Sequence, residues 1–459
     1  MQENKTDEMR RIFGRVLAEI KPSKEEIDGL TLHTNELMLR LKRIVAKDVE
    51  IEVVGSTAHG TNLRGDTDID IFLLFKQGTK REEMVKNALS YARRIVRKGM
   101  HERYEIKYAE HPYARVYLDD YNIKADIVPA IRIKSIGEIA TAVDRSPLHV
   151  EFINRNLSEK QKDDVRLLKY FLKVHGIYGA ETKIGGFSGY LCELLIYHYG
   201  SLENALANLA NMKLPLGLDP KGKIEIKDPL LFRKFNTDFL VLDPVDPDRN
   251  VAAGVSRESL ARLALIASMF IERPSIRAFY GKGFSEAEVS SLIKGFMERT
   301  GLHLYMLVVR VPDKSSEIIW PELRKVSEKI VSLSAQYGFS IYITLQWISK
   351  DRGIIAFFAP EQKLKSRIIK GPSAFQGKHA LMFIKSHKND YGFIVDGESI
   401  SAIEANRYKT VRDVFEDVAK GKLGRYKDIS FNKAALFVDK VPKRYREDLY
   451  AELIKKISI

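Results

Sequence analysis

The sequence predicts a multidomain α/β protein with a mixed α/β head, a helical central domain and an α+β C-terminal domain. At 459 residues, the chain is too long for one ordinary hydrophobic core. β-branched alternation and helical periodicity follow one another near the N-terminus, and strand-like runs return beyond about residue 285. Apolar residues make up 45% and charged residues 30% of the chain, which is typical of folded globular proteins.

The head is predicted to occupy residues 1–145. Ser23 and Glu26 form a capping box that predicts a helix start, and apolar residues then recur at helical spacing. Two segments with β-branched alternation flank a loop rich in Gly, Thr and Asn, and they predict strands over 50–55 and 68–75. Further along, the pattern predicts a helix over 81–98 and strands over 104–109, 113–118 and 122–129.

The other two domains are predicted to occupy residues 146–275 and 276–459. The central domain is mostly helical, and its clearest helices are predicted over 165–174 and 189–197. The C-terminal domain has the order strand, helix, strand, strand, which indicates a ferredoxin-like plait. Its strands are predicted over 303–311, 340–347 and 353–358, with a helix over 322–336 and a final helix after Pro442.

The charge balance favours a polyanionic partner. Lys and Arg number 75 and Asp and Glu number 61, so the net charge is +14, and nucleic acid binds basic surfaces through its phosphates. No apolar run reaches the roughly 18 to 20 residues that span a bilayer, and the N-terminus lacks a signal-peptide pattern. We therefore expect a cytoplasmic protein without a membrane partner. A single cysteine, Cys192, excludes an internal disulfide.

Three carboxylates are the strongest chemical signal in the sequence. Asp68 and Asp70 are two residues apart on a predicted strand, so both side chains leave the same face of the sheet. Such close like charges are costly unless a cation lies between them, and Mg²⁺ prefers carboxylate and phosphate oxygens. Asp126, on another predicted strand, would complete a site for two metal ions of the kind that promotes phosphoryl transfer.

Gly55 and Ser56 open the turn after the first strand of the head. Backbone N–H groups and a small hydroxyl at such a turn can bind triphosphate oxygens. The order of this turn, the Asp pair and Asp126 resembles the catalytic signature of the polymerase β nucleotidyltransferase superfamily. Other segments resemble the archaeal-type, class I CCA-adding tRNA nucleotidyltransferases, and these are residues 108–113, 142–149, 166–173, 176–181, 185–195 and 242–252.

This resemblance implies a role for individual residues. Asp68, Asp70 and Asp126 match the metal-binding triad of the family, and Asp126 would also activate the terminal 3′-hydroxyl of the RNA. Nucleotide-binding positions of the family correspond to Gly55, Ser56, His59, His149, Lys169 and Tyr178. Positions that line the pocket for the base or the tRNA end correspond to His111 and Arg249.

Two positions depart from the family pattern. The family often has an arginine where this chain has His59, and an aromatic residue where it has Asn62. Because free imidazole titrates near pH ~6.5, we expect the triphosphate contact at His59 to be weaker or pH-sensitive.

The activity that the resemblance implies is template-independent addition of CCA to the 3′ end of tRNA from CTP and ATP, with Mg²⁺ as cofactor and release of pyrophosphate. Two alternatives remain open. A poly(A) polymerase shares the catalytic signature but adds a long run of A, and a chain whose nucleotidyltransferase head is catalytically silent would be an RNA-binding protein. The tRNA acceptor stem and T-arm are expected to contact basic loops of the later domains, at 221–223, 281–283, 363–370 and 420–425. The sequence leaves a homodimer open.

Overall fold

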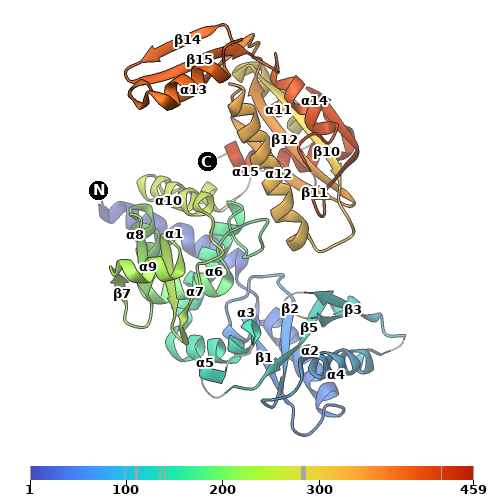
Figure 1. Ribbon diagram of the computed structural model, residues 1–459. Coiled ribbons are helices and arrows are strands. Elements are labelled where there is room, and N and C mark those ends of the chain that lie inside the picture. The colour runs from blue at the N-terminus through green and yellow to red at the C-terminus, as the bar shows by residue number, and fades with distance from the viewer. Residues whose placement is uncertain are drawn as a thin grey trace. The chain divides into compact units, whose positions relative to one another are not determined.

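The computed structural model describes residues 2–97, 99–108, 112–133, 136–138, 141–280, 286–424 and 426–457, and it divides into two compact units (Figure 1). The first unit comprises residues 1–281 and the second unit residues 282–458. Within the described ranges, no helix is both long and apolar enough to cross a membrane. Short 3-10 helices lie at Asp119–Tyr121, Ile136–Glu138, Ala142–Arg145, Ile276–Phe279, Ala374–Gln376 and Lys443–Tyr445.

A five-stranded sheet of order β1-β2-β5-β4-β3 forms the head of the first unit. It is mixed because β2 and β5 are parallel whereas the other neighbours are antiparallel. Its strands are β1 (Glu50–Val54), β2 (Asp68–Phe75), β3 (Glu102–Tyr108), β4 (Pro112–Leu118) and β5 (Ile123–Ile131). The helices of the head are α2 (Lys24–Lys42), α3 (Gly55–His59) and α4 (Arg81–Ile95).

One face of this sheet is apolar and the other carries the polar groups of β2. Ile69 and Ile71 are completely buried under α2 and α4, where they pack with Leu37 and Leu41. Asp68 and Asp70 alternate with them and therefore point to the opposite face. The predicted capping box of Ser23 and Glu26 begins α2. The alternation of β2 thus fixes which side of the sheet can hold polar chemistry.

The helical body is the rest of the first unit. Its core joins α6 and α7 to α1, so the N-terminal helix packs there and not on the head sheet. Its helices are α1 (Gln2–Ile20), α5 (Ser146–Asn156), α6 (Glu159–Val174), α7 (Gly189–Tyr199), α8 (Leu202–Ala210), α9 (Pro229–Phe235) and α10 (Arg257–Glu272). The structure adds a small sheet to this mostly helical region, formed by β6 (Leu216–Asp219), β7 (Ile224–Ile226), β8 (Phe239–Asp243) and β9 (Asp246–Asn250).

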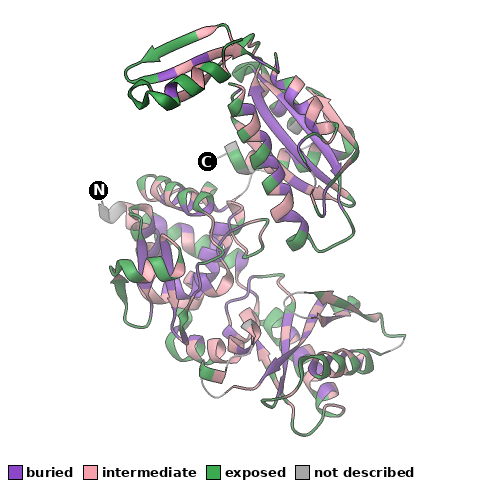
Figure 2. Ribbon diagram, in the orientation of Figure 1, coloured by how far each residue is buried: buried purple, intermediate pink, exposed green. Residues whose placement is uncertain are grey.

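Four antiparallel strands of order β11-β12-β10-β16 form the main sheet of the second unit. Together with α12 and α14 they confirm the predicted ferredoxin-like plait. Strands β10 and β12 are buried along almost their whole length, as Figure 2 shows, because helices cover both faces of the sheet. The elements are β10 (Leu302–Arg310), β11 (Ile343–Ser349), β12 (Arg352–Pro360), β16 (Ser430–Val438), α11 (Glu286–Thr300), α12 (Ser316–Gln336), α14 (Val411–Ala419) and α15 (Arg446–Ile457).

A second, smaller sheet is inserted between β12 and α14 of this plait. It has the order β13-β15-β14 and one helix, α13, packs on it. Its elements are β13 (Ser366–Ser373), α13 (Lys378–Ser386), β14 (Gly392–Asp396) and β15 (Ser399–Ala405). The sequence pattern did not predict this insertion. It leaves large apolar side chains exposed, among them Phe375, Leu381, Met382 and Val395.

Candidate active site

The structure brings the three predicted carboxylates together on the polar face of the head sheet. Asp70 on β2 lies directly opposite Asp126 on β5 in the parallel register, and Asp68 precedes Asp70 by two residues. Because opposed residues of neighbouring strands point the same way and the strands lie ~4.8 Å apart, Asp70 and Asp126 are neighbours, and Asp68 leaves the same face of the sheet. Asp68 is exposed, whereas Asp70 and Asp126 are half-buried.

The electrostatics of this region favour an added cation. Burial, followed by the negative charges of Asp126 and Asp68, raises the pKa of Asp70 to about 6. The ionised form of Asp70 is therefore costly in the protein alone. Oxygen donors from three carboxylates suit a hard divalent cation, which would remove this cost.

Arg115 on β4 is a close partner of Asp126 that sequence reasoning missed. Its Nε lies 2.6 Å from Oδ1 of Asp126 and its Nη2 lies 2.7 Å from Oδ2, a bidentate ion pair. The hydrogen bonds to Asp126, together with the charge of that carboxylate, raise the pKa of Arg115 above the usual range although burial opposes this. The bidentate pair thus holds Asp126 in a fixed orientation.

The Gly55–Ser56 turn approaches the carboxylates closely. Gly55 has a φ of +76°, and a Cβ at this position would lie 2.2 Å from Oδ2 of Asp70. Only glycine fits there, because a side chain would be both strained and in collision with the carboxylate. The sequence predicted that Gly55 and Ser56 open a turn after the first strand. In the structure, Ser56 lies in the first turn of the short helix α3, which follows β1 directly.

The segment after α3 is fixed to the helical body by Arg166 of α6. This buried guanidinium donates from Nη2 to the carbonyl of Gly60 at 2.5 Å and from Nε to the carbonyl of Asn62 at 3.0 Å. Asp163, one turn earlier on α6, accepts from Nη1 at 2.6 Å and balances the charge. The loop that carries Ser56 and His59 therefore has a defined place against α6.

Two predicted nucleotide-binding residues, His59 and Lys169, meet at a buried carboxylate. Oε2 of Glu193 on α7 lies 2.8 Å from Nδ1 of His59, and Oε1 lies 3.4 Å from Nζ of Lys169. Thr61 donates to Oε1 at 2.5 Å and accepts from Lys169 at 2.9 Å. Burial alone raises the pKa of a carboxyl, but the charges of Lys169 and His59 and the hydrogen bonds from His59 and Thr61 lower that of Glu193 to about 2.

Two further predicted residues, His149 and Arg249, meet at a second buried carboxylate, Asp243. Asp243 lies 2.9 Å from Nε2 of His149, and it accepts hydrogen bonds from Nη1 of Arg249 at 2.8 Å and from the hydroxyl of Tyr190 at 3.0 Å. The imidazole of His149 stacks on the ring of Tyr190, with centroids 3.9 Å apart. Burial lowers the pKa of His149, although its bond to Asp243 opposes this.

The first turn of α7 lies beside both clusters. Ser188 caps this helix, and a Cβ at Gly189 would lie 3.2 Å from the hydroxyl of Tyr178 and 3.4 Å from Cε of Lys169. Tyr190, which follows, stacks on His149. Helix N-termini favour anions through their free N–H groups and the helix dipole. Predicted ligands of the triphosphate from both clusters therefore gather near the start of one helix.

The structure adds residues to the site that the sequence did not predict, and it leaves one predicted residue undescribed. His111 lies outside the described residues. Glu193, Asp243, Tyr190 and Arg115 were missed, because each acts through a partner on another element of the fold. Glu193 did leave a signal, since it is the single charged residue in the otherwise apolar run Leu191–Ile196.

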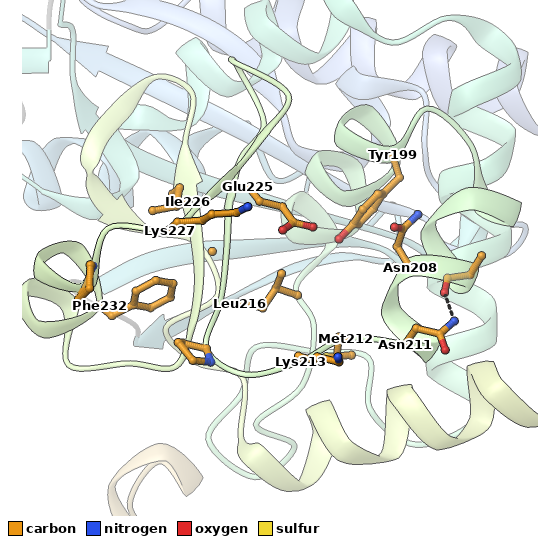
Figure 3. A pocket seen from close by; sticks show the side chains of 14 residues that line it. Tyr199, Asn208, Asn211, Met212, Lys213, Leu216, Glu225, Ile226, Lys227 and Phe232 are labelled. Atoms are coloured by element: carbon orange, nitrogen blue, oxygen red, sulfur yellow. Dashed lines mark hydrogen bonds between the residues drawn. The ribbon is translucent and has the colours of Figure 1, made fainter.

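A separate pocket lies elsewhere in the helical body, between the end of α8, the β6–β7 hairpin and α9 (Figure 3). Its volume is about 660 Å³. Tyr199, Asn208 and Glu225 point into it from one side and Phe232 from the other. None of its lining residues belongs to the predicted site, so this pocket contributes nothing to the arrangement of the carboxylates.

Comparisons with known proteins match three successive parts of the chain. The model of the nucleotidyltransferase domain matches residues 35–168, and that of the second domain of tRNA nucleotidyltransferase matches residues 163–280. The model of the C-terminal domain of CCA-adding enzymes matches residues 300–432. Among solved structures, Cid1 poly(U) polymerase has a TM-score of 0.48 and 16% identity, with 60% of this chain and 98% of that chain covered.

Curated relatives match over almost the whole chain. The CCA-adding enzyme of Methanocaldococcus jannaschii is 35% identical, with 90% of this chain and 92% of that protein covered. The CCA-adding enzyme of Sulfurisphaera tokodaii is 34% identical, with 87% and 90% covered. These similarities agree with the resemblance found in the sequence. The chain belongs to the family of CCA-adding enzymes and has the polymerase β-like nucleotidyltransferase fold.

Proposed function

We propose that this chain adds CCA to the 3′ end of tRNA, without a nucleic-acid template, using CTP and ATP. The observation that carries the proposal is the convergence of Asp68, Asp70 and Asp126 beside the Gly55–Ser56 turn. The family membership supports CCA as the added sequence. We place the reaction in the cytoplasm, and the proposal is compatible with a homodimer.

The cofactor in this proposal is Mg²⁺, held by Asp68, Asp70 and Asp126. The donor set fits it, because all three side chains offer hard oxygen ligands and the pKa of Asp70 is raised by burial and the neighbouring negative charges. When bound, the ion would stabilise negative charge on the phosphates during transfer.

In the proposed reaction, the 3′-oxygen of the RNA bonds to the α-phosphorus of the nucleotide and the bond from this phosphorus to the bridging oxygen of the β-phosphate breaks. Asp126 accepts the proton of the 3′-hydroxyl, and pyrophosphate leaves with the electron pair of the broken bond. Arg115 keeps Asp126 oriented until the substrates arrive. Proton transfer to a positioned carboxylate contributes about 10² to 10⁴-fold to the rate of such a step.

The triphosphate is proposed to bind between the Gly55–Ser56 turn and the first turn of α7. Ser56 would bind it from the head, and His59, Lys169 and Tyr178 from the cluster around Glu193. His149 would bind it near Asp243, and Arg249 would line the pocket for the base or the tRNA end, together with His111. The two buried carboxylates support this assignment, because each holds a cationic side chain and an imidazole in place.

The tRNA is proposed to contact the second unit through its acceptor stem and T-arm. Exposed lysines on and near β13, such as Lys363, Lys365 and Lys370, offer positive charge to the phosphates. The described part of the loop at 420–425 adds Lys420 and Lys422. Base edges of an A-form helix lie in a deep, narrow groove, so contacts to phosphates and 2′-hydroxyls are expected.

The test is to count the nucleotides added to a tRNA that lacks its 3′ CCA. Labelled CTP or ATP is supplied singly and together with Mg²⁺, and products are resolved at single-nucleotide length beside the Asp68→Ala variant. Two additions with CTP alone, and a third when ATP is added, would support the proposal. A long ladder with ATP alone would indicate a poly(A) polymerase, and no extension despite tRNA binding would indicate a silent head.

A further inference from the structure

His59 has one nitrogen in use and one without a partner. Its Nδ1 lies 2.8 Å from Oε2 of Glu193, whereas Nε2 is buried and has no hydrogen-bond partner among the described residues. The whole residue is only 5% exposed. A buried nitrogen without a partner destabilises the fold, so it is expected where a ligand supplies the missing bond.

Glu193 is the group that fixes the orientation of the His59 imidazole. Its carboxylate is 1% exposed and accepts from Thr61 as well as lying against Lys169 and His59. A buried carboxylate destabilises the fold unless its partners compensate for the lost hydration. Here the cluster joins three elements of the first unit, namely the end of α3 with the loop after it, helix α6 and helix α7.

Charged and titratable groups from several elements surround His59. Glu193 of α7 and Lys169 of α6 compensate one another on the Nδ1 side. Asp70 of β2 and His149 of α5 are close enough for the charge of His59 to affect the pKa of each. The imidazole therefore lies between the carboxylates of the head and the phosphate ligands of the body.

We propose that Glu193 is a positioning residue for the triphosphate, which it serves by holding His59 with Nε2 directed to the phosphate oxygens. A carboxylate on Nδ1 fixes the orientation of the ring and leaves Nε2 facing the ligand. In an imidazolium both ring nitrogens are donors, so one can bond Glu193 and the other a phosphate oxygen. Lys169 lies further from Glu193, at 3.4 Å, and donates to Thr61 at 2.9 Å, so its position depends less on Glu193 than that of His59 does. This inference rests on the proposed function, because it takes the triphosphate of CTP or ATP as the ligand.

The test compares Glu193→Gln with the wild type in two measurements. Equilibrium titration with a fluorescent CTP gives the dissociation constant, and single-nucleotide incorporation gives kcat and KM. Loss of an ionic hydrogen bond to the ligand corresponds to about tenfold in affinity, so the dissociation constant and KM should rise about tenfold while kcat changes less. An unchanged dissociation constant would overturn the inference.

A matched control separates positioning from the general loss of a buried ion pair. Glu102 pairs with Arg40 at 2.8 Å in the head, and both side chains are at most 10% exposed. The Glu102→Gln variant should therefore lower stability in thermal unfolding as Glu193→Gln does, but leave CTP affinity unchanged. An equal loss of CTP affinity in both variants would mean that Glu193 is merely structural.

The decisive comparison repeats the substitution in a chain without the imidazole. In the His59→Gln background, Glu193→Gln should weaken CTP binding by no more than about twofold beyond His59→Gln alone, because coupled residues are not additive. If the two substitutions weakened CTP binding by independent factors that multiply in the double variant, Glu193 would not act through His59. Should Glu193→Gln not fold, Glu193→Asp keeps the charge but withdraws the carboxylate by one methylene, and unaltered CTP affinity in that variant would equally overturn the inference.

The same experiments distinguish this inference from the proposed function. A wild type that binds CTP but adds no nucleotide to tRNA would contradict the proposed function, and the binding data would still decide the role of Glu193. A wild type that adds CCA, with CTP affinity unchanged in the Glu193 variants, would contradict the inference alone.

Discussion

The two units of this chain differ in what they bury. In the described part of the first unit, the buried polar residues include five charged or titratable ones at the candidate site or its supports, namely His59, Arg166, Lys169, Glu193 and Asp243. In the described part of the second unit, the buried polar residues are Ser327, Ser334, Asn406 and Asp428. Buried charge costs stability, and here it is concentrated at or beside the residues that are proposed to bind the nucleotide.

The second unit shows the opposite design. The main sheet of this unit, β11-β12-β10-β16, packs apolar side chains on both faces. Among them, the rings of Tyr305 and Phe415 stack with their centroids 5.0 Å apart. Lysines such as Lys363, Lys365 and Lys370 are exposed on its surface. The contrast teaches that an ordinary apolar core with exposed lysines suits the RNA binding proposed for the second unit, whereas the proposed transfer site requires polar groups held inside the protein.

The largest effect should follow from Asp126→Ala. Removal of this carboxylate takes away both a ligand of the metal ion and the proposed acceptor of the 3′-hydroxyl proton, so incorporation should fall by at least about a thousandfold. Affinity for tRNA, measured by filter binding, should stay within a few-fold because the RNA is held mainly elsewhere. The exposed Asp120→Ala serves as a control, and an equal loss of tRNA binding in Asp126→Ala would break the division between the units.

A large effect of another kind should follow from Phe415→Ala in the second unit. Phe415 is completely buried, so truncation should lower the free energy of unfolding of this unit by about 3–5 kcal/mol. Denaturant unfolding monitors the change, while titration with a fluorescent CTP monitors the first unit. If CTP affinity fell in parallel under native conditions, the two units would not have the separate roles that their cores indicate.

A moderate effect is expected from the basic surface of the second unit. Replacement of Lys365 and Lys370 by alanine should weaken tRNA binding several-fold. It should also reduce the slope of log affinity against log salt by about one for each phosphate that the variant no longer neutralises. Single-nucleotide incorporation at saturating tRNA should be retained. Lys86→Ala, on the exposed face of α4 in the head, is the matched control, and the same weakening there would argue for a non-specific charge effect.

The smallest effect concerns a buried carboxylate that lies away from the site. Asp164 of α6 has a buried Oδ2 without a hydrogen-bond partner among the described residues, and burial raises its pKa to about 6. The folded protein thus keeps this proton to a higher pH than the unfolded chain does, and ionisation destabilises the fold as pH rises from about 4 to 6.

Asp164→Asn cannot ionise, so it should raise the thermal midpoint at pH 7 by about 2 °C and have little effect near pH 4. Thermal unfolding at both pH values checks this, with the exposed Asp28→Asn as the control. A gain of the same size at both pH values would show that ionisation of Asp164 is not the cause.

Much of the fold could be predicted because the decisive patterns are local. The alternation in β2 placed Ile69 and Ile71 in the core and Asp68 and Asp70 outside it, as the structure shows. The sheet of β6–β9 was missed because its strands have only three to five residues and lie among prolines. The inserted sheet of β13–β15 was missed because its strands have mostly exposed or half-buried residues and weak patterning.

The site could be predicted only in part, for a related reason. The positions of the three aspartates follow from strand alternation and from a familiar order of motifs. Glu193 contacts His59, which is 134 residues away in the sequence, and Asp243 contacts His149, which is 94 residues away. No local sequence pattern encodes contacts between residues so far apart in the chain. The predicted domain boundaries at residues 145 and 275 and the individual ligand roles stay predictions.

The central claim, stepwise addition of C, C and A, is tested most directly with three tRNAs that end before the first C, after one C, and after two. Each is incubated with Mg²⁺ and either CTP or ATP, and the first product is resolved at single-nucleotide length. The account predicts CTP incorporation on the first two tRNAs, ATP incorporation on the third, and no further extension. Efficient ATP incorporation on the first tRNA, or continued addition beyond A, would contradict it.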